Sequence, residues 1–230
     1  MLMMSSYLMN HVSRPEQLTL HPWIDASCNQ LSAELMLRAV PIPDVAPSSF
    51  LSGPAGSEGE GRPPRCPDLS MCAGEFLEVY ADDVACWDAV VTCFFLDTAP
   101  NAMEYVEAIE RMLVPGGVWI NFGPLMYHWC SSAANERDDR FHRSMEFSYD
   151  EVRHLVRSFG FTFTREERRE VNYTANPHSM MKTAYTCAFF SAVKPGGTTD
   201  TTPFRAPGAV DIIPPPAPAA GAGGAGAAEE

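Results

Sequence analysis

Between residues 87 and 122 the pattern of apolar positions changes from that of a buried strand to that of a helix, and then back to that of a strand. Residues Trp87 to Leu96 read WDAVVTCFFL, a largely apolar run that is typical of a strand buried on both faces of a parallel sheet. The next segment has apolar residues close to helical spacing, at Met103, Val106, Ile109 and Leu113. Pro115-Gly116-Gly117 is expected to stop this helix, and Val118 to Phe122 then reads as a second short buried strand.

The later part of the chain adds one helix and two strands to this pattern. Ser148 is a predicted helix N-cap, and Glu151, three residues further on, completes a capping box. The helix is expected to end before Gly160. Phe161 to Arg165 and Tyr185 to Val193 read as further strands. The order strand, helix, strand, followed by helix, strand and strand, predicts an α/β fold.

Composition divides the chain into a domain and a tail. Residues 1–195 contain the alternating strand and helix signals, and the Pro/Gly/Ser-rich stretch 47–67 inside them predicts a long surface loop. Residues 196–230 are mostly Pro, Gly, Ala and Thr. We expect this tail to be disordered, because it cannot bury enough apolar surface to offset its ordering entropy. The opening MLMMSSYLMN could be a helix, so the domain is expected to begin without its first strands.

Charge and cysteine content narrow the functional classes. With 46% hydrophobic residues the chain can form a core, and its formal net charge of −13 argues against nucleic acid as a partner, since phosphate binding needs clustered Lys and Arg. The seven cysteines include no Cys-x-x-Cys pair, so neither a zinc site nor a disulfide framework is predicted. The start is not a signal peptide, and there is no apolar run of about eighteen residues that would predict a membrane helix. We expect a cytoplasmic protein, with the nucleus as an open alternative.

Five stretches of the sequence occur in order and span most of residues 1–195: HPWID at His21 to Asp25, AGEF at Ala73 to Phe76, TCFFLDTAPN at Thr92 to Asn101, PGGVWINFGPLMYH at Pro115 to His128, and SMMKTAYTC at Ser179 to Cys187. Together they resemble the carnosine N-methyltransferase family, also called N2227-like proteins. The resemblance implies a class I S-adenosylmethionine-dependent methyltransferase with a Rossmann-like, doubly wound sheet. The family's Gly-rich cofactor turn and ribose-binding acid would lie upstream of Met1, so the domain is expected to be N-terminally incomplete.

The resemblance also implies a binding site for S-adenosylmethionine as cofactor. Glu75 and Phe76 would lie against the adenosine part of S-adenosylmethionine, and Cys93 would line the same pocket. The family usually has Asp at the position of Glu75. In open α/β sheets, ligands bind beyond the carboxyl ends of the strands, which is where Cys93 is expected.

A second group of residues would bind the methyl acceptor. By resemblance, Asp97 accepts the N–H of a substrate imidazole, which leaves the lone pair of the other ring nitrogen aimed at the methyl group. The carboxylate of Asp97 would also stabilise the positive charge that develops on the ring. His128 and Tyr185 match two further substrate contacts, whereas Thr183 and Ala184 stand where the family tends to have tyrosines.

Without the resemblance, each of these residues has a structural explanation. Asp97 could cap the helix that follows it. Phe76 and Cys93 could be ordinary core residues, and Tyr185 could simply pack. His128 could be a hydrogen-bonded structural histidine.

Two functional hypotheses follow. The first is an N-methyltransferase that converts carnosine into anserine or acts on a related histidine-containing peptide. Its substrate would be a small dipeptide, and we expect no metal, no nucleic acid partner and no membrane partner. A homodimer is one open possibility for its assembly. The second is a truncated, non-catalytic methyltransferase-like binding or regulatory module. The absent cofactor turn favours the second hypothesis, and the presence of Asp97, His128 and Tyr185 favours the first.

Overall fold

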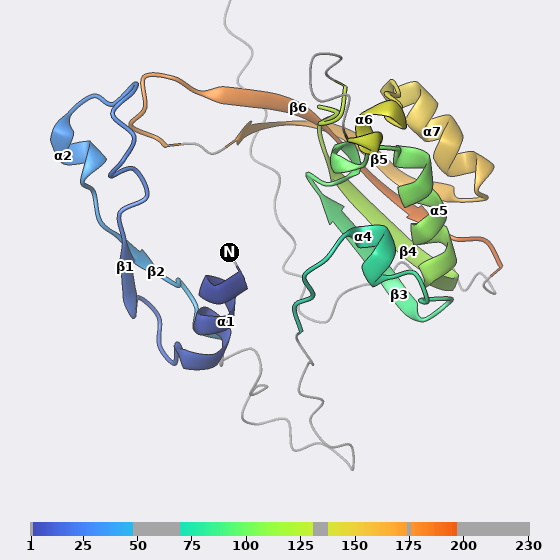
Figure 1. Ribbon diagram of the computed structural model, residues 1–230, viewed down its shortest axis with the longest axis horizontal. Helices are drawn as coiled ribbons and strands as arrows, with labels where there is room; N and C mark the ends of the chain where they lie inside the picture. The colour runs from blue at the N-terminus through green and yellow to red at the C-terminus, as the bar shows by residue number, and fades with distance from the viewer. Residues whose placement is uncertain (1, 48–69, 131–137, 174–175, 197–230) are drawn as a thin grey trace, which may run out of the picture. The chain divides into compact units, whose positions relative to one another are not determined.

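The computed structural model describes residues 2–47, 70–130, 138–173 and 176–196, and its main feature is a four-stranded sheet (Figure 1). The strand order is β3-β4-β6-β5, with bounds Trp87–Cys93 for β3, Leu113–Gly123 for β4, Thr183–Val193 for β6 and Thr162–Tyr173 for β5. The β3–β4 pair is parallel, and both pairs that involve β6 are antiparallel. The α/β prediction is therefore confirmed. The predicted loop 47–67 and tail 196–230 fall almost wholly outside the described residues.

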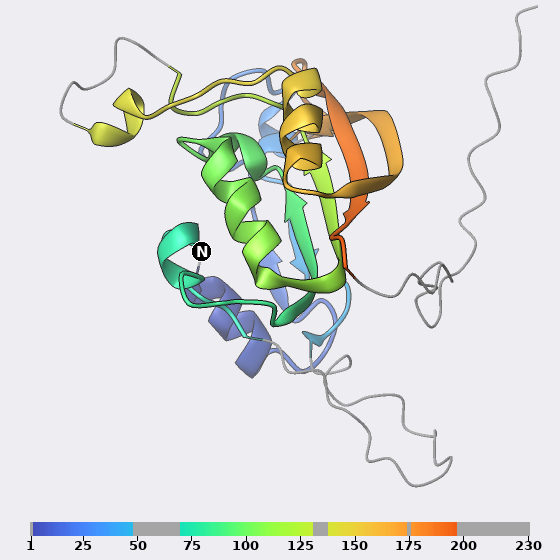
Figure 2. The ribbon, with the colours of Figure 1, turned by 90° about the vertical axis from the view of Figure 1, so that its right-hand side faces the viewer.

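Two helices cover one face of this sheet, α5 (Ala102–Met112) and α7 (Tyr149–Ser158) (Figure 2). The side chain of Asn101 caps α5 by accepting the Met103 N–H at 3.0 Å. Ser148 and Glu151 form the predicted capping box of α7. The buried core between the helices and the sheet contains Val106 and Ile109 of α5, Val152 and Val156 of α7, Trp119 of β4 and Phe190 of β6.

The remaining described elements are short. Residues 2–47 contain α1 (Leu2–His11), β1 (Leu18–Leu20), α2 (Ala33–Met36) and β2 (Val40–Ile42), and β1 pairs antiparallel with β2. The predicted opening helix is thus confirmed. Three further pieces belong to the segments around the sheet: α4 (Phe76–Val79), the 3-10 turn η1 (Leu96–Thr98) and α6 (Asp139–His142). Within the described part of the chain, no helix is long and apolar enough to cross a membrane.

One sequence expectation about burial is wrong. The apolar run that forms β3 was expected to be buried on both faces, yet Val91 is 68% exposed and Trp87 is 44% exposed. The reason is that β3 is an edge strand, because its single described neighbour is β4. A strand buried on both faces needs neighbours and cover on each side, and composition alone does not say whether the chain supplies them.

Several element boundaries also differ from the expectations. The predicted helix ends at Met112, and Pro115-Gly116-Gly117 lies inside β4 rather than after the helix. The strand expected at 161–165 continues to Tyr173 through alternating charged residues. This strand lies at the edge of the sheet, where its many charged residues can face solvent. Charged residues on an edge strand also disfavour pairing with strands of other chains.

Candidate functional site

The carboxyl ends of β3 and β4 approach each other closely, and this approach shapes the candidate site. Phe94, directly after β3, has a positive φ of 50°, and its N–H donates to the Phe122 carbonyl at 2.7 Å. A Cβ added at Gly123 would lie 3.1 Å from the Phe94 backbone, a tight contact that favours glycine there. A bulky residue in the left-handed region is strained, and such strain is concentrated at functional sites.

Asp97 lies in η1 just beyond this turn and is only 3% exposed. Its Oδ2 accepts the Met126 N–H at 2.8 Å, and its backbone carbonyl accepts the His128 N–H at 3.1 Å. A buried carboxylate needs such partners, since an unpaired buried charge is very costly. The alternative that Asp97 caps the following helix is wrong, because Asn101 occupies that position.

The segment after β4 is fixed at its backbone while the ring of His128 stays exposed. Tyr127 is buried, and its hydroxyl donates to the Phe147 carbonyl at 2.8 Å. Burial raises the pKa of Tyr127 to about 12, with the charge of Asp97 adding to the effect, so the phenol remains a neutral donor at ordinary pH. With its neighbours anchored, His128 is exposed while its backbone N–H is held by the Asp97 carbonyl.

Tyr185 belongs to an aromatic cluster that begins at the strained turn. Its ring centroid lies 6.2 Å from that of Phe94 and 5.4 Å from that of Tyr173, with edge-to-face geometry in both pairs. Phe94 and Tyr173 are stacked, with centroids 5.4 Å apart. Tyr173 is also the β5 partner of Thr183, one of the two positions where the family tends to have tyrosine. The cluster therefore provides a second tyrosine from the neighbouring strand.

Glu75 and Phe76 lie together at a groove on the exposed side of β3. The groove has a volume of about 520 Å³, which is in the range of small-molecule sites. Glu75 is the N-cap of α4: its Oε2 accepts the Glu78 N–H at 3.1 Å, and its Oε1 lies 3.5 Å from the Tyr105 hydroxyl, which donates to it. The Phe76 ring centroid lies 4.9 Å from that of Tyr105. Burial, followed by the charge of Glu75, raises the pKa of Tyr105 to about 12.

The expected site residues thus fall into two groups. Glu75 and Phe76 line the groove, whereas Asp97 and His128 meet through the backbone at the carboxyl end of the sheet. Cys93 is exposed at the end of β3 but is not one of the side chains that line the groove. Among the described residues, no group of three or more potential metal ligands occurs.

Three participants at the site were missed by the sequence reasoning. They are the Met126 N–H, which donates to the Asp97 carboxylate, the left-handed backbone of Phe94, and the Tyr105 hydroxyl beside Glu75. Tyr105 could have been noticed, because it adds a polar atom to the buried side of a predicted amphipathic helix. The backbone donor and the left-handed turn leave no comparable trace in the pattern of residue types.

Comparisons with known proteins give one consistent result. The sequence profile of the carnosine N-methyltransferase family matches residues 1–196. The chain is 38% identical to the carnosine N-methyltransferase of Mus musculus over 196 residues, which are 85% of this chain and 44% of the relative. The identity to the Dictyostelium discoideum carnosine N-methyltransferase is 38% over 195 residues, which are 84% and 37% of the two chains. The chain therefore spans less than half the length of these relatives.

The solved structures that match this chain are much more distant from it. A putative methyltransferase from Bacillus halodurans has 9% sequence identity and a TM-score of 0.36, covering 50% of this chain and 67% of its own. A S-adenosylmethionine-dependent methyltransferase from Methanosarcina mazei has 14% identity and a TM-score of 0.34, covering 50% and 62%.

Proposed function

The chain belongs to the carnosine N-methyltransferase family, and from this premise we propose that it transfers a methyl group from S-adenosylmethionine to an imidazole nitrogen of carnosine, giving anserine, or of a related histidine-containing peptide. Membership of this family identifies the sheet as part of a class I methyltransferase fold. The observation that supports the activity most is the buried carboxylate of Asp97, held by the Met126 N–H, while the backbone carbonyl of Asp97 holds the N–H of the exposed His128.

The residues at the groove fit the cofactor in character. Phe76 and Tyr105 supply aromatic surface for an adenine ring, and the Glu75 carboxylate supplies acceptor oxygens for hydroxyl groups. When bound, S-adenosylmethionine supplies an electrophilic methyl group on a positively charged sulfur. Glu75 and the net negative charge of the chain favour such a cation near the groove.

The proposed role of Asp97 follows from its position and charge. Its carboxylate accepts the N–H of the acceptor imidazole, so that the other ring nitrogen keeps its lone pair. That lone pair forms the new N–C bond as the C–S bond breaks and its electrons go to sulfur. The ring becomes positively charged, and the buried carboxylate stabilises this charge before the N–H proton is released to water. Orientation of the ring provides much of the remaining assistance.

His128 and Tyr185 would complete the acceptor site. The exposed ring of His128 can bind the peptide part of the acceptor, since its backbone is already fixed to Asp97. Tyr185, with Phe94 and Tyr173, offers aromatic edges and faces against which a flat imidazole can pack. A cationic ring is favoured at such aromatic faces, which suits the methylated product as it forms.

The alternative is a non-catalytic binding or regulatory module. The observation that favours it is the exposed edge strand β3, whose apolar side chains form one wall of the groove. A groove with so open a wall would hold a ligand weakly. The two proposals differ in whether any version of the protein transfers methyl groups.

The experiment that tests the proposal is a methyl-transfer assay with labelled S-adenosylmethionine. Carnosine and a longer His-containing peptide serve as acceptors, and the chain is compared with a version extended upstream of Met1. Transfer to carnosine by either version supports the proposal. If the extended version binds S-adenosylmethionine but methylates only the longer peptide, the acceptor is a protein or peptide histidine. Absence of transfer to both acceptors, with cofactor bound, favours the non-catalytic module.

A further inference from the structure

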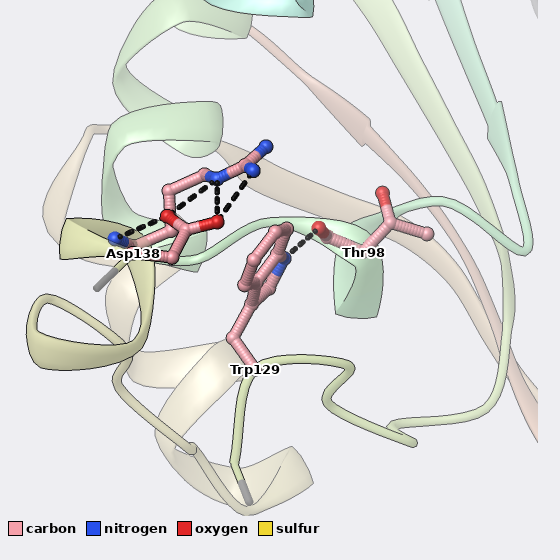
Figure 3. Close-up of polar contacts among 4 residues, drawn as sticks. Thr98, Trp129 and Asp138 are labelled. Carbon is pink, nitrogen blue, oxygen red and sulfur yellow. Dashed lines mark hydrogen bonds and ion pairs between the residues drawn. The ribbon is translucent and has the colours of Figure 1, made fainter. Parts of the chain in front are cut away.

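Three contacts tie the segment after β4 to the turn that contains Asp97. Two have been described, the Met126 N–H to the Asp97 carboxylate and the His128 N–H to the Asp97 carbonyl. The third comes from Trp129, whose indole Nε1–H donates to the Thr98 carbonyl at 2.9 Å (Figure 3). The donors of the first two contacts are backbone N–H groups, whereas the donor of the third is a side chain. The third contact can therefore be removed by a substitution that alters neither Asp97 nor His128.

The indole of Trp129 is itself held by α6. The guanidinium carbon of Arg140 lies 4.3 Å from the ring centroid, and the Phe141 ring meets the indole edge to face at 5.0 Å. Asp138 fixes the guanidinium through Nε–Oδ1 and Nη2–Oδ2 contacts of 2.9 and 2.6 Å, as the dashed lines at Asp138 show (Figure 3). Such a bidentate pair has a defined geometry, and an arginine stacked on indole is a favourable cation–π arrangement.

This arrangement extends from α6 to the candidate acceptor site. Asp138 holds Arg140, Arg140 stacks on Trp129, and Trp129 bonds the carbonyl directly after Asp97. Because Trp129 also follows His128 directly, its ring orientation restrains both functional residues from one point. Trp129, Arg140 and Asp138 do not line the groove of Glu75 and Phe76, although the hydrogen bond with Asp138 and, after it, the charge of Glu75 raise the pKa of Arg140.

We propose that Trp129 is a positioning residue for the methyl acceptor: its bond to Thr98 sets the position of the Asp97 carboxylate relative to the His128 ring. The inference rests on the proposed function. It assigns to Trp129, with Arg140 and Asp138 behind it, a part in recognising the imidazole-containing acceptor. Small misplacements of orienting groups are costly for a displacement reaction, which requires an aligned lone pair.

The kinetic test uses Trp129→Phe in the version of the protein that methylates carnosine. Phenylalanine keeps an aromatic face for Arg140 but lacks the N–H donor. Loss of one neutral hydrogen bond predicts a fall of a few degrees in Tm, which is the size that the free energy of one such bond gives in a domain of this length. The loosened Asp97 turn predicts a rise of about 3- to 10-fold in the KM for carnosine, with the KM for S-adenosylmethionine unchanged. Asp138→Asn, which weakens the hold on Arg140, is expected to raise the same KM by less.

The matched control is Trp23→Phe, which alters another indole that stacks on an arginine, Arg38 at 4.6 Å. It is expected to leave both KM values unchanged. The inference is overturned if Trp129→Phe leaves the KM for carnosine at the wild-type value. It is also overturned if both KM values rise together, because that result describes a purely structural role.

A second measurement does not depend on activity. Hydrogen exchange of the Met126 and His128 amides reports directly on their bonds to Asp97, and it can be followed in the chain itself. We expect both amides to exchange faster in Trp129→Phe and at the wild-type rate in Trp23→Phe. If the wild type methylates no imidazole, the proposed function fails, but unchanged exchange in Trp129→Phe would still refute the positioning role separately.

Discussion

Substitutions of Asp97 can separate its structural contribution from its chemical one. Asp97 is 3% exposed, and its Oδ2 pairs with the Met126 N–H at 2.8 Å. Asp97→Ala removes the acceptor and leaves the amide unpaired, which costs about 1–3 kcal/mol of folding free energy. Asp97→Asn retains an acceptor oxygen for the same N–H, so we expect its loss of stability to be below about 1 kcal/mol.

The effect of the two variants on methyl transfer should be more alike. Both remove the negative charge that would stabilise the imidazole as it becomes positive. A hydrogen bond to a charged group contributes about 1.5–3 kcal/mol, which corresponds to a loss of roughly 10- to 150-fold in kcat/KM. Asp97→Asn is therefore expected to fold almost normally and to be a poor catalyst.

Two assays check this prediction. Urea unfolding gives the change in folding free energy, and initial rates with labelled S-adenosylmethionine and carnosine give kcat/KM for the active version. The reasoning about the reaction is refuted if Asp97→Asn retains kcat/KM within about twofold of the wild type. The reasoning about the Met126 contact is refuted if Asp97→Ala is as stable as Asp97→Asn.

Three further outcomes are expected. Lys194→Met should lower the free energy of unfolding by about 1.5–3 kcal/mol in urea titrations, because the Lys194 ammonium donates to the carbonyls of Glu110 and Leu113 at 2.6 and 2.9 Å and is mostly buried. A wild-type value for Lys194→Met would contradict this. Tyr105, whose pKa is raised to about 12 by burial and by Glu75, should contribute stability that is present below about pH 10 and lost as the pH rises towards 12. Tyr105→Phe should lack that loss when unfolding is compared at pH 8 and pH 11, and an equal loss in both proteins would refute the assignment. Finally, the chain by itself should bind S-adenosylmethionine weakly, because the groove is open along an exposed strand, and a tight stoichiometric isotherm in calorimetry would contradict this.

The parts of the fold that sequence reasoning predicted are those with local causes. The capping box at Ser148 and Glu151 involves residues three apart, and their side chains and backbone form it wherever a helix follows. The parallel β3–α5–β4 unit follows likewise from the periods of adjacent segments. The exposure of Val91 could not be predicted in this way, because it depends on which strands flank β3 and not on β3 itself.

The sequence predicted which residues belong to the candidate site but not which atoms they contact. The family resemblance identified Asp97 and His128, yet the partner of the Asp97 carboxylate is a backbone N–H that lies 29 positions away in the sequence. Any residue other than proline at position 126 can donate that bond, so no residue type marks it. The left-handed conformation of Phe94 is equally hidden, since phenylalanine is not a residue type that favours it.

The turn from Phe94 to Asp97 links the two groups of site residues. Phe95 contacts the groove side, with its ring centroid 5.2 Å from that of Phe76, while Phe94 packs on the aromatic cluster of Tyr185. Asp97 follows directly and is fixed by the segment that contains His128. A donor in the groove and an acceptor at Asp97 would therefore be positioned by one short stretch of chain, so a shift of that stretch would move the two reactants relative to each other. This is a physical reason for the dense anchoring of the turn by backbone hydrogen bonds, a strained residue and the Trp129 indole.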